Sequence, residues 1–158
     1  MRLLMPLFAV SAWFQATACQ PDSPASSKLS AQDQVALRAY AARDSALVMS
    51  RNWDGLAAEY APDGVRMPPN QAPVQGRDAI RRWLEQLPPV SAFSFRLEDL
   101  QGSGEHAFLR GTYSISIALP DGKTVSDRGK TLLAFRKQPD GSWLCVADIW
   151  NSDLPLQQ

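Results

Sequence analysis

The chain has 158 residues, which leaves room for one domain once its two ends are set aside. Its 16 Lys and Arg residues balance 16 Asp and Glu residues, and no basic patch or series of stacking aromatic residues predicts binding to nucleic acid. Neither a metal-ligand spacing nor a glycine-rich phosphate loop occurs, so the sequence predicts no metal and no cofactor.

The first 18 residues are predicted to be a signal peptide that does not belong to the fold. Arg2 supplies a positive start, residues 3–10 form an apolar run too short to span a bilayer, and small residues fill positions 16–18. Cys19 follows directly, and this arrangement resembles the bacterial lipobox, in which the signal is cut before a cysteine that is then acylated. The alternative is an ordinary signal peptide that is cut near Ala18.

The lipobox resemblance implies a lipid on Cys19, and residues 19–29 are expected to form a lipid-anchored, flexible linker because Pro, Ser and Ala dominate them. Gln20 rather than Asp follows the cysteine, which in lipoproteins of two-membraned bacteria indicates the outer membrane. We therefore expect an outer-membrane lipoprotein on the periplasmic side, in contact with the membrane through Cys19 only. Cys145 then has no partner for a disulfide and is expected to be a small core residue.

Three helices are predicted in the next part of the chain. Ser30 and Asp33 resemble a capping box that opens a helix reaching about residue 51. Asn52 can cap a second, short helix over residues 53–60, which a Pro-Asp-Gly turn then ends. A third helix follows Gly76, because apolar residues recur there with helical spacing until two consecutive prolines stop the pattern.

After these prolines the hydrophobic period changes from 3.6 to 2, which predicts strands. Alternating residues around 93–97 and long runs at 106–119, 124–137 and 143–152 are separated by glycine-containing turns. Three helices followed by a hairpin-linked meander predict a single α+β domain over residues 30–155, with one face of the sheet covered by helices.

The stretches 59–70 (EYAPDGVRMPPN) and 74–80 (VQGRDAI), with the ending DGSW at 140–143 and DIWNSD at 148–153, resemble the nuclear transport factor 2-like superfamily. They are most similar to its SnoaL-like and SgcJ/EcaC-type domains of unknown function. The resemblance implies a cone-shaped domain, cystatin-like in outline, in which three helices pack on a curved antiparallel sheet. It also implies a conical pocket between sheet and helices.

Ketosteroid isomerase has this fold and uses a carboxylate base with two acidic hydrogen-bond donors. The resemblance places Met67 or Pro68 at the position of the base, and Leu132 or Leu133 at the position of one donor. None of these side chains can transfer a proton. The same chemistry by the same arrangement is therefore not expected, although the pocket is expected to persist.

The isomerase's tyrosine on the first helix aligns with Asp44, and its pocket tryptophan aligns with Trp150. Asp44 lies within the apolar stripe of its helix, and Asp148 shares a strand face with Trp150. Two carboxylates facing one pocket predict a catalytic acid/base pair or a group that orients a ligand. The alternative is that each carboxylate caps a backbone group or pairs with Arg110 or Lys130.

Tyr40, Met67, Arg110 and Trp150 are the predicted ligand-binding residues. Tyr40 precedes Asp44 by one turn, and Met67 and Trp150 align with positions that line the isomerase pocket. Homology would also turn Arg110 into the pocket and would turn the isoleucines of its strand toward a partner subunit, whereas simple patterning sends those isoleucines to the core. The homology alternative implies a homodimer, which we expect.

Three functions remain open. The first is an exported, lipid-anchored domain that binds a small, partly apolar molecule in its conical pocket. The second is an acid/base enzyme of isomerase, cyclase or dehydratase type that uses Asp44 and Asp148. The third is an interaction protein that works through the outer face of its sheet. The first is our leading hypothesis, because the acids of the isomerase are not matched while the pocket is expected to remain.

Overall fold

The computed structural model describes residues 28–155. The predicted signal peptide, Cys19 and most of the predicted linker lie outside the described residues. None of the helices in residues 28–155 combines the length and the apolar character that crossing a bilayer requires.

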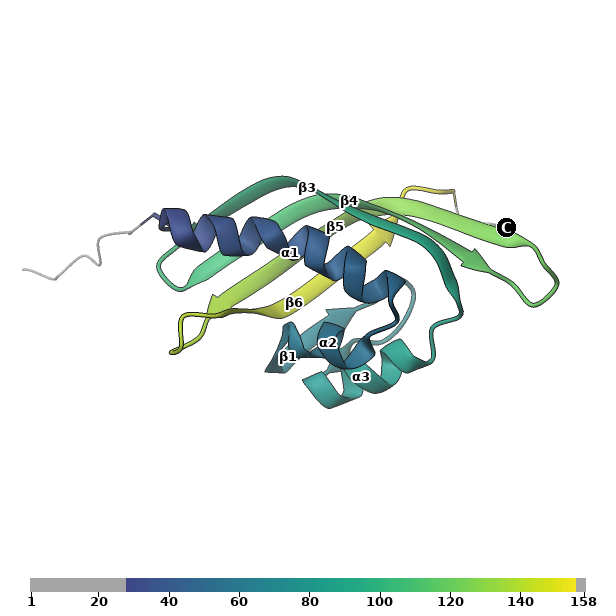
Figure 1. Cartoon of the computed structure of the whole chain (residues 1–158), viewed down its shortest axis with the longest axis horizontal. Helices are drawn as coiled ribbons and strands as arrows, with labels where there is room; N and C mark the ends of the chain where they lie inside the picture. Colours follow the sequence, from purple (N-terminus) through teal and green to yellow (C-terminus); the bar gives the residue numbers. More distant parts are fainter. Residues whose placement is uncertain (1–27, 156–158) are drawn as a thin grey trace, which may run out of the picture.

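One six-stranded sheet and three helices make up the described chain (Figure 1). The helices are α1 (Ala31–Met49), α2 (Trp53–Ala58) and α3 (Arg77–Glu85). The strands are β1 (Tyr60–Met67), β2 (Val74–Gln75), β3 (Val90–Ser103), β4 (His106–Ala118), β5 (Thr124–Lys137) and β6 (Trp143–Ser152). In space the strands follow the order β2-β1-β6-β5-β4-β3. The prediction of an α+β domain with three helices on a curved sheet is confirmed.

The sheet is mixed rather than purely antiparallel, which corrects one detail of the prediction. Strand β1 pairs with β6 in parallel, whereas every other neighbouring pair is antiparallel. The parallel pair arises because the chain leaves β1, builds α3 and the meander β3–β6, and returns beside β1. Residues 62–64, which we predicted as a turn, lie inside β1 at an irregularity in its register with β6.

The predicted caps of the first two helices are present. The Ser30 hydroxyl accepts a hydrogen bond from the Asp33 N–H at 3.1 Å and donates one to the Asp33 carboxylate at 2.6 Å. The Asn52 side chain accepts a hydrogen bond from the Gly55 N–H. Helix α2 ends earlier than predicted, because Tyr60 already belongs to β1 and pairs with Cys145 of β6.

The helices lie against the concave face of the sheet (Figure 1). Helix α1 crosses the β3 side of that face, while α2 and α3 pack beside β1. The buried apolar side chains between these layers contribute roughly 1.5–3 kcal/mol each. The largest of them that are almost fully buried are Tyr40, Tyr60, Phe135, Leu37, Leu56, Ile80, Leu84, Leu109 and Cys145. The core occupies one part of the space between the layers, and a pocket occupies another.

Candidate functional site

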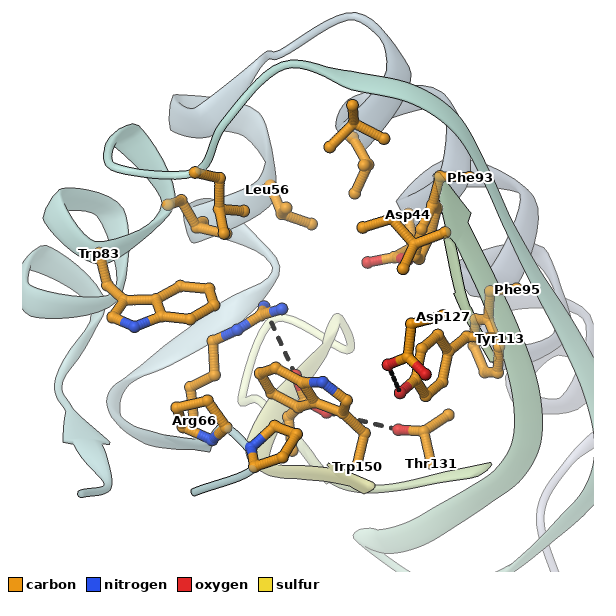
Figure 2. A pocket seen from close by; sticks show the side chains of 18 of the residues that line it. Asp44, Leu56, Arg66, Trp83, Phe93, Phe95, Tyr113, Asp127, Thr131 and Trp150 are labelled. Atoms are coloured by element: carbon orange, nitrogen blue, oxygen red, sulfur yellow. Dashed lines mark hydrogen bonds and ion pairs between the residues drawn. The ribbon is translucent and has the colours of Figure 1, made fainter. Parts of the chain in front are cut away.

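A pocket of about 310 Å³ opens between the concave face of the sheet and the helices. Figure 2 shows its labelled side chains around an open centre, with Trp83, Arg66 and Trp150 on one side and Asp44, Tyr113 and Asp127 on the other. The lining residues are Tyr40, Asp44, Val48, Leu56, Arg66, Pro68, Pro69, Gln71, Trp83, Leu84, Leu87, Val90, Phe93, Phe95, Tyr113, Ile115, Ile117, Asp127, Thr131, Leu133, Asp148 and Trp150. Most of the wall is therefore apolar or aromatic, with a few polar groups.

Helical and strand periodicity bring the polar groups to the pocket. Tyr40 and Asp44 are one turn apart on α1, so both face the sheet. Asp148 and Trp150 are two residues apart on β6 and share its concave face. The same alternation along β4 turns Ile115 into the pocket, as simple patterning predicts.

Arg66 of β1 lies at the centre of a buried polar network. Its guanidinium donates a hydrogen bond to the Tyr60 hydroxyl at 2.5 Å and forms an ion pair with the Asp148 carboxylate at 3.5 Å. The Tyr60 hydroxyl in turn donates to the same carboxylate at 2.7 Å. Asp148 is only 6% exposed, so this pairing with Arg66 compensates a charge that would otherwise be costly to bury.

The guanidinium of Arg66 also packs against the rings of two tryptophans that line the pocket. Its central carbon lies 4.6 Å from the ring centre of Trp150 and 5.0 Å from that of Trp83. The two indole rings meet edge to face, with centroids 6.0 Å apart. Burial alone would lower the pKa of Arg66, but Tyr60, Asp148 and Asp44 outweigh it and raise that pKa, so Arg66 stays charged.

Asp44 differs from Asp148 because it has no hydrogen-bond partner in the described part of the chain. Its carboxyl group points toward the open centre of the pocket in Figure 2. Burial raises the pKa of this carboxyl from 3.8 to about 7, with Asp148 and Glu59 acting in the same direction and Arg66 and Arg43 against it. Near neutral pH, Asp44 can therefore either donate or accept a proton.

Two further polar atoms at the pocket are buried without a hydrogen-bond partner among the residues that the structure describes. They are the hydroxyl of Tyr40, a residue that is 1% exposed, and Nε of Arg66. Buried polar groups are nearly always paired with protein, water or ligand. These two atoms therefore indicate places where a bound molecule or an ordered water would make hydrogen bonds.

A third carboxylate, Asp127 of β5, lines the pocket on the same side as Asp44 in Figure 2. It accepts hydrogen bonds from the hydroxyls of Tyr113 at 2.8 Å and Ser152 at 2.5 Å, and from the backbone N–H of Arg128 at 2.8 Å. Burial and the hydrogen bond to Asp127 raise the pKa of Tyr113, so this phenol stays protonated and keeps donating. Asp127 is thus oriented by neutral donors.

The structure brings four of the six predicted catalytic and ligand-binding residues together. Asp44, Asp148, Tyr40 and Trp150 all line the pocket. Met67 does not, because it follows Arg66 on β1 and strand alternation turns it away. The roles of the four residues remain predictions.

Arg110 does not line the pocket either, which contradicts the orientation taken from homology. It is exposed on the outer face of β4 and pairs with Glu98 at 2.6 Å. The partners proposed for the aspartates were also wrong, since Lys130 pairs with Asp153 and Asp148 pairs with Arg66. The isoleucines of β4 line the pocket and are not available to a partner subunit.

Arg66, Trp83 and Asp127 are site residues that sequence reasoning missed. Arg66 stands between two apolar residues of an extended segment, which is a weak sign of an inward-facing charge. Trp83 belongs to the apolar face of α3. The helical spacing of apolar residues does not tell whether such a side chain packs in the core or lines a pocket. Within residues 28–155, no group of three or more His, Cys, Asp or Glu side chains is placed to hold a metal ion.

Fold and pocket together define a cone-shaped domain of the nuclear transport factor 2-like class. A ketosteroid isomerase-like protein from Erwinia carotovora atroseptica SCRI1043 superposes with a TM-score of 0.72 at 18% identity, covering 80% of this chain and 100% of that one. A nuclear transport factor 2-like protein with a cystatin-like fold from Novosphingobium aromaticivorans gives 0.66 at 20% identity, covering 79% and 85%. These likenesses show the fold alone.

Within this class, the chain belongs to the SnoaL-like domain family, whose model matches residues 36–144. A protein from Catenulispora acidiphila, solved in complex with S-DNPA, is also similar, with a TM-score of 0.63 at 20% identity and coverage of 78% of this chain and 96% of that one. No curated protein matches this chain.

Proposed function

We propose that this protein binds a small, partly apolar molecule in the pocket between α1, α3 and the sheet. The observation that carries the proposal is a largely apolar pocket of about 310 Å³ that is lined by the carboxyl of Asp44 and by the buried hydroxyl of Tyr40, which has no hydrogen-bond partner among the described residues. Ligand sites in proteins have this combination of an apolar wall and a few convergent polar groups. The likeness to a protein solved in complex with S-DNPA supports a small-molecule ligand.

Thermal-shift screening of the chain from residue 28 onward against small metabolites tests this proposal, with native mass spectrometry to establish stoichiometry. A ligand should raise the melting temperature and bind once per chain. Ile115→Trp fills the pocket and should abolish binding, whereas Ser114→Trp on the exposed side of the same strand should preserve it. Equal binding by both variants would place the ligand elsewhere and contradict the proposal.

A second candidate function is acid/base catalysis by Asp44. Its pKa of about 7 suits a group that gives and takes protons near neutral pH, and it lies beside the pocket space where a substrate would sit. Asp148 is engaged by Tyr60 and Arg66, so we assign it to holding Arg66 rather than to proton transfer. With an identified substrate, unchanged turnover by Asp44→Asn would eliminate this candidate.

We also propose export and lipid anchoring through Cys19. The support is the sequence of the first 19 residues, with its positive start, apolar run and small residues before the cysteine. Labelling of cells with a fatty-acid probe should mark the wild-type protein and leave Cys19→Ser unmarked. Labelling of both proteins would show that the anchor is not on this cysteine.

We also propose that the protein forms a homodimer, but through the outer face of the sheet rather than through the isoleucines of β4. The outer sheet face carries the exposed side chains of Phe108, Leu132 and Ile149, and the last two are paired neighbours on β5 and β6. Light scattering should give twice the chain mass for the wild type and the single mass for Leu132→Asp. A wild-type monomer at high concentration would contradict this assembly.

A further inference from the structure

The charges that line the pocket do not balance. Asp44, Asp127 and Asp148 contribute three carboxylates, whereas Arg66 is the single Lys, Arg or His side chain among the lining residues. Charges in a largely apolar pocket are costly unless they are paired, so an excess of negative groups there favours a positive ligand. The pocket is therefore matched in charge to a cation.

Arg66 lowers the pKa of Asp44 but supplies only part of the missing compensation, because its guanidinium is shared with other groups, although its Nε has no hydrogen-bond partner among the described residues. It pairs with Asp148 and Tyr60, and its guanidinium faces the rings of Trp150 and Trp83. Asp127 is held by the Tyr113 and Ser152 hydroxyls and by a backbone N–H, none of which carries charge. Asp44 is left facing the cavity with no hydrogen-bond partner among the described residues.

The walls of the same pocket suit a cation on an apolar body. Phe93, Phe95 and Tyr113 line the space beside Asp44 in Figure 2, and aromatic faces attract ammonium groups. The unpartnered hydroxyl of Tyr40, one helical turn from Asp44, can accept an N–H. Leucine and isoleucine side chains around the remaining wall would hold the apolar part of the molecule.

We propose that the ligand of this pocket is a protonated amine on an apolar body, whose ammonium group forms an ion pair with Asp44. This inference rests on the proposed binding function and names the chemical class of its ligand. Proton linkage follows, because a protonated Asp44 cannot pair with an ammonium group. Arg43, Glu59, Arg66, Asp148 and Tyr40 are the other charged or titratable groups whose fields act on Asp44, and Arg43 and Glu59 already form an ion pair with each other.

The test is isothermal titration of the full-length protein with three probes of one shape: 3-phenylpropan-1-amine, 3-phenylpropan-1-ol and 3-phenylpropanoate. At pH 8 the amine should bind at least tenfold more tightly than the alcohol, and its advantage should shrink about tenfold at pH 6, where Asp44 is mostly protonated. At pH 7 the binding of the amine should release protons to the buffer, which titrations in buffers of different ionisation enthalpy detect.

Asp44→Asn should bind the amine no better than the alcohol, whereas Asp78→Asn, at an exposed carboxylate on α3, should keep the wild-type preference. A wild-type preference for the alcohol or the carboxylate would overturn the cationic class while leaving the binding function in place. Failure of all three probes to bind would count against both. Loss of amine binding as the pH rises from 6 to 8 would contradict the ion pair, whatever the behaviour of the variants.

Discussion

Asp44 makes the stability of the folded state fall as the pH rises, which is the opposite of the usual effect of a carboxylate. Its carboxyl has a pKa of about 7 in the folded chain, compared with 3.8 when exposed, because burial disfavours the charged form. Between about pH 4 and pH 7 the folded state therefore binds this proton more tightly than the unfolded state. The contribution of Asp44 to stability is most favourable below pH 4 and is lost as the pH rises through 7.

Replacing Asp44 with Asn should remove this pH-dependent penalty. We expect Asp44→Asn to gain stability over the wild type at pH 8, by up to roughly 4 kcal/mol, and to lose that advantage near pH 4. Urea denaturation of both proteins at the two pH values measures the difference. A stability difference between the two proteins that does not change with pH would contradict the raised pKa.

Arg66 should be among the residues to which stability is most sensitive. Arg66→Met leaves the Asp148 carboxylate buried without its counter-ion, which typically costs about 3–5 kcal/mol. Arg110→Met, which breaks the exposed pair with Glu98, should cost about 1 kcal/mol or less. Urea denaturation at pH 7 compares the two variants.

The double variant Arg66→Met with Asp148→Asn provides the control for this argument. It removes both charges, so it should recover part of the stability that Arg66→Met loses. An Arg66→Met protein as stable as Arg110→Met would show that the buried pair contributes little.

At the scale of elements, the start of α1 is attached to the sheet through one carboxylate. Asp33 accepts hydrogen bonds from the Trp143 indole N–H at 2.8 Å and from the Ser30 hydroxyl, and it pairs with Lys137 at 2.7 Å. These contacts, with that of Lys137 first, hold the pKa of Asp33 well below its ordinary value. A lowered folded-state pKa contributes stability above about pH 4, and that stability is lost as the pH falls further.

Asp33→Asn should therefore destabilise the protein at pH 7, by about 1–3 kcal/mol, and the difference from the wild type should shrink as the pH falls below about 4. Asp54→Asn, which breaks an exposed pair with Arg81, is the matched control and should change stability by less than about 1 kcal/mol. Urea denaturation at pH 7 and pH 3 distinguishes the two. An Asp33→Asn deficit that persists unchanged at pH 3 would contradict the role of its charge.

Sequence alone predicts the elements that have strong local signals. The bounds of β5 and β6 are those expected, because Pro-Asp-Gly turns precede both strands and Gly122 and Gly141 adopt the positive φ values, 82° and 85°, that these turns need. The end of α2 is less predictable, since Tyr60 enters β1 through a pairing with the distant Cys145. Local propensity cannot reveal such a partner.

At the scale of the whole molecule, some residues of the site could be predicted from the sequence and others could not. Asp44 could be predicted because a carboxylate inside an apolar helical stripe is unusual, and Trp150 because the family resemblance aligns it with a pocket position. Arg66 could not be predicted, since its burial depends on Asp148 and two tryptophans that come together only in the folded chain. Arg110 was misplaced because strand alternation prevails over the orientation taken from a distant enzyme.

The central claim is that the carboxyl group of Asp44 lies in a largely apolar pocket with no hydrogen-bond partner among residues 28–155. An NMR titration of the side-chain carboxyl carbon of Asp44, assigned with the Asp44→Asn variant, tests this most directly. The folded protein should show a midpoint near pH 7, and the urea-unfolded chain a midpoint near 3.8. A midpoint near 4 in the folded protein would mean that Asp44 is solvated or paired, and it would contradict the account.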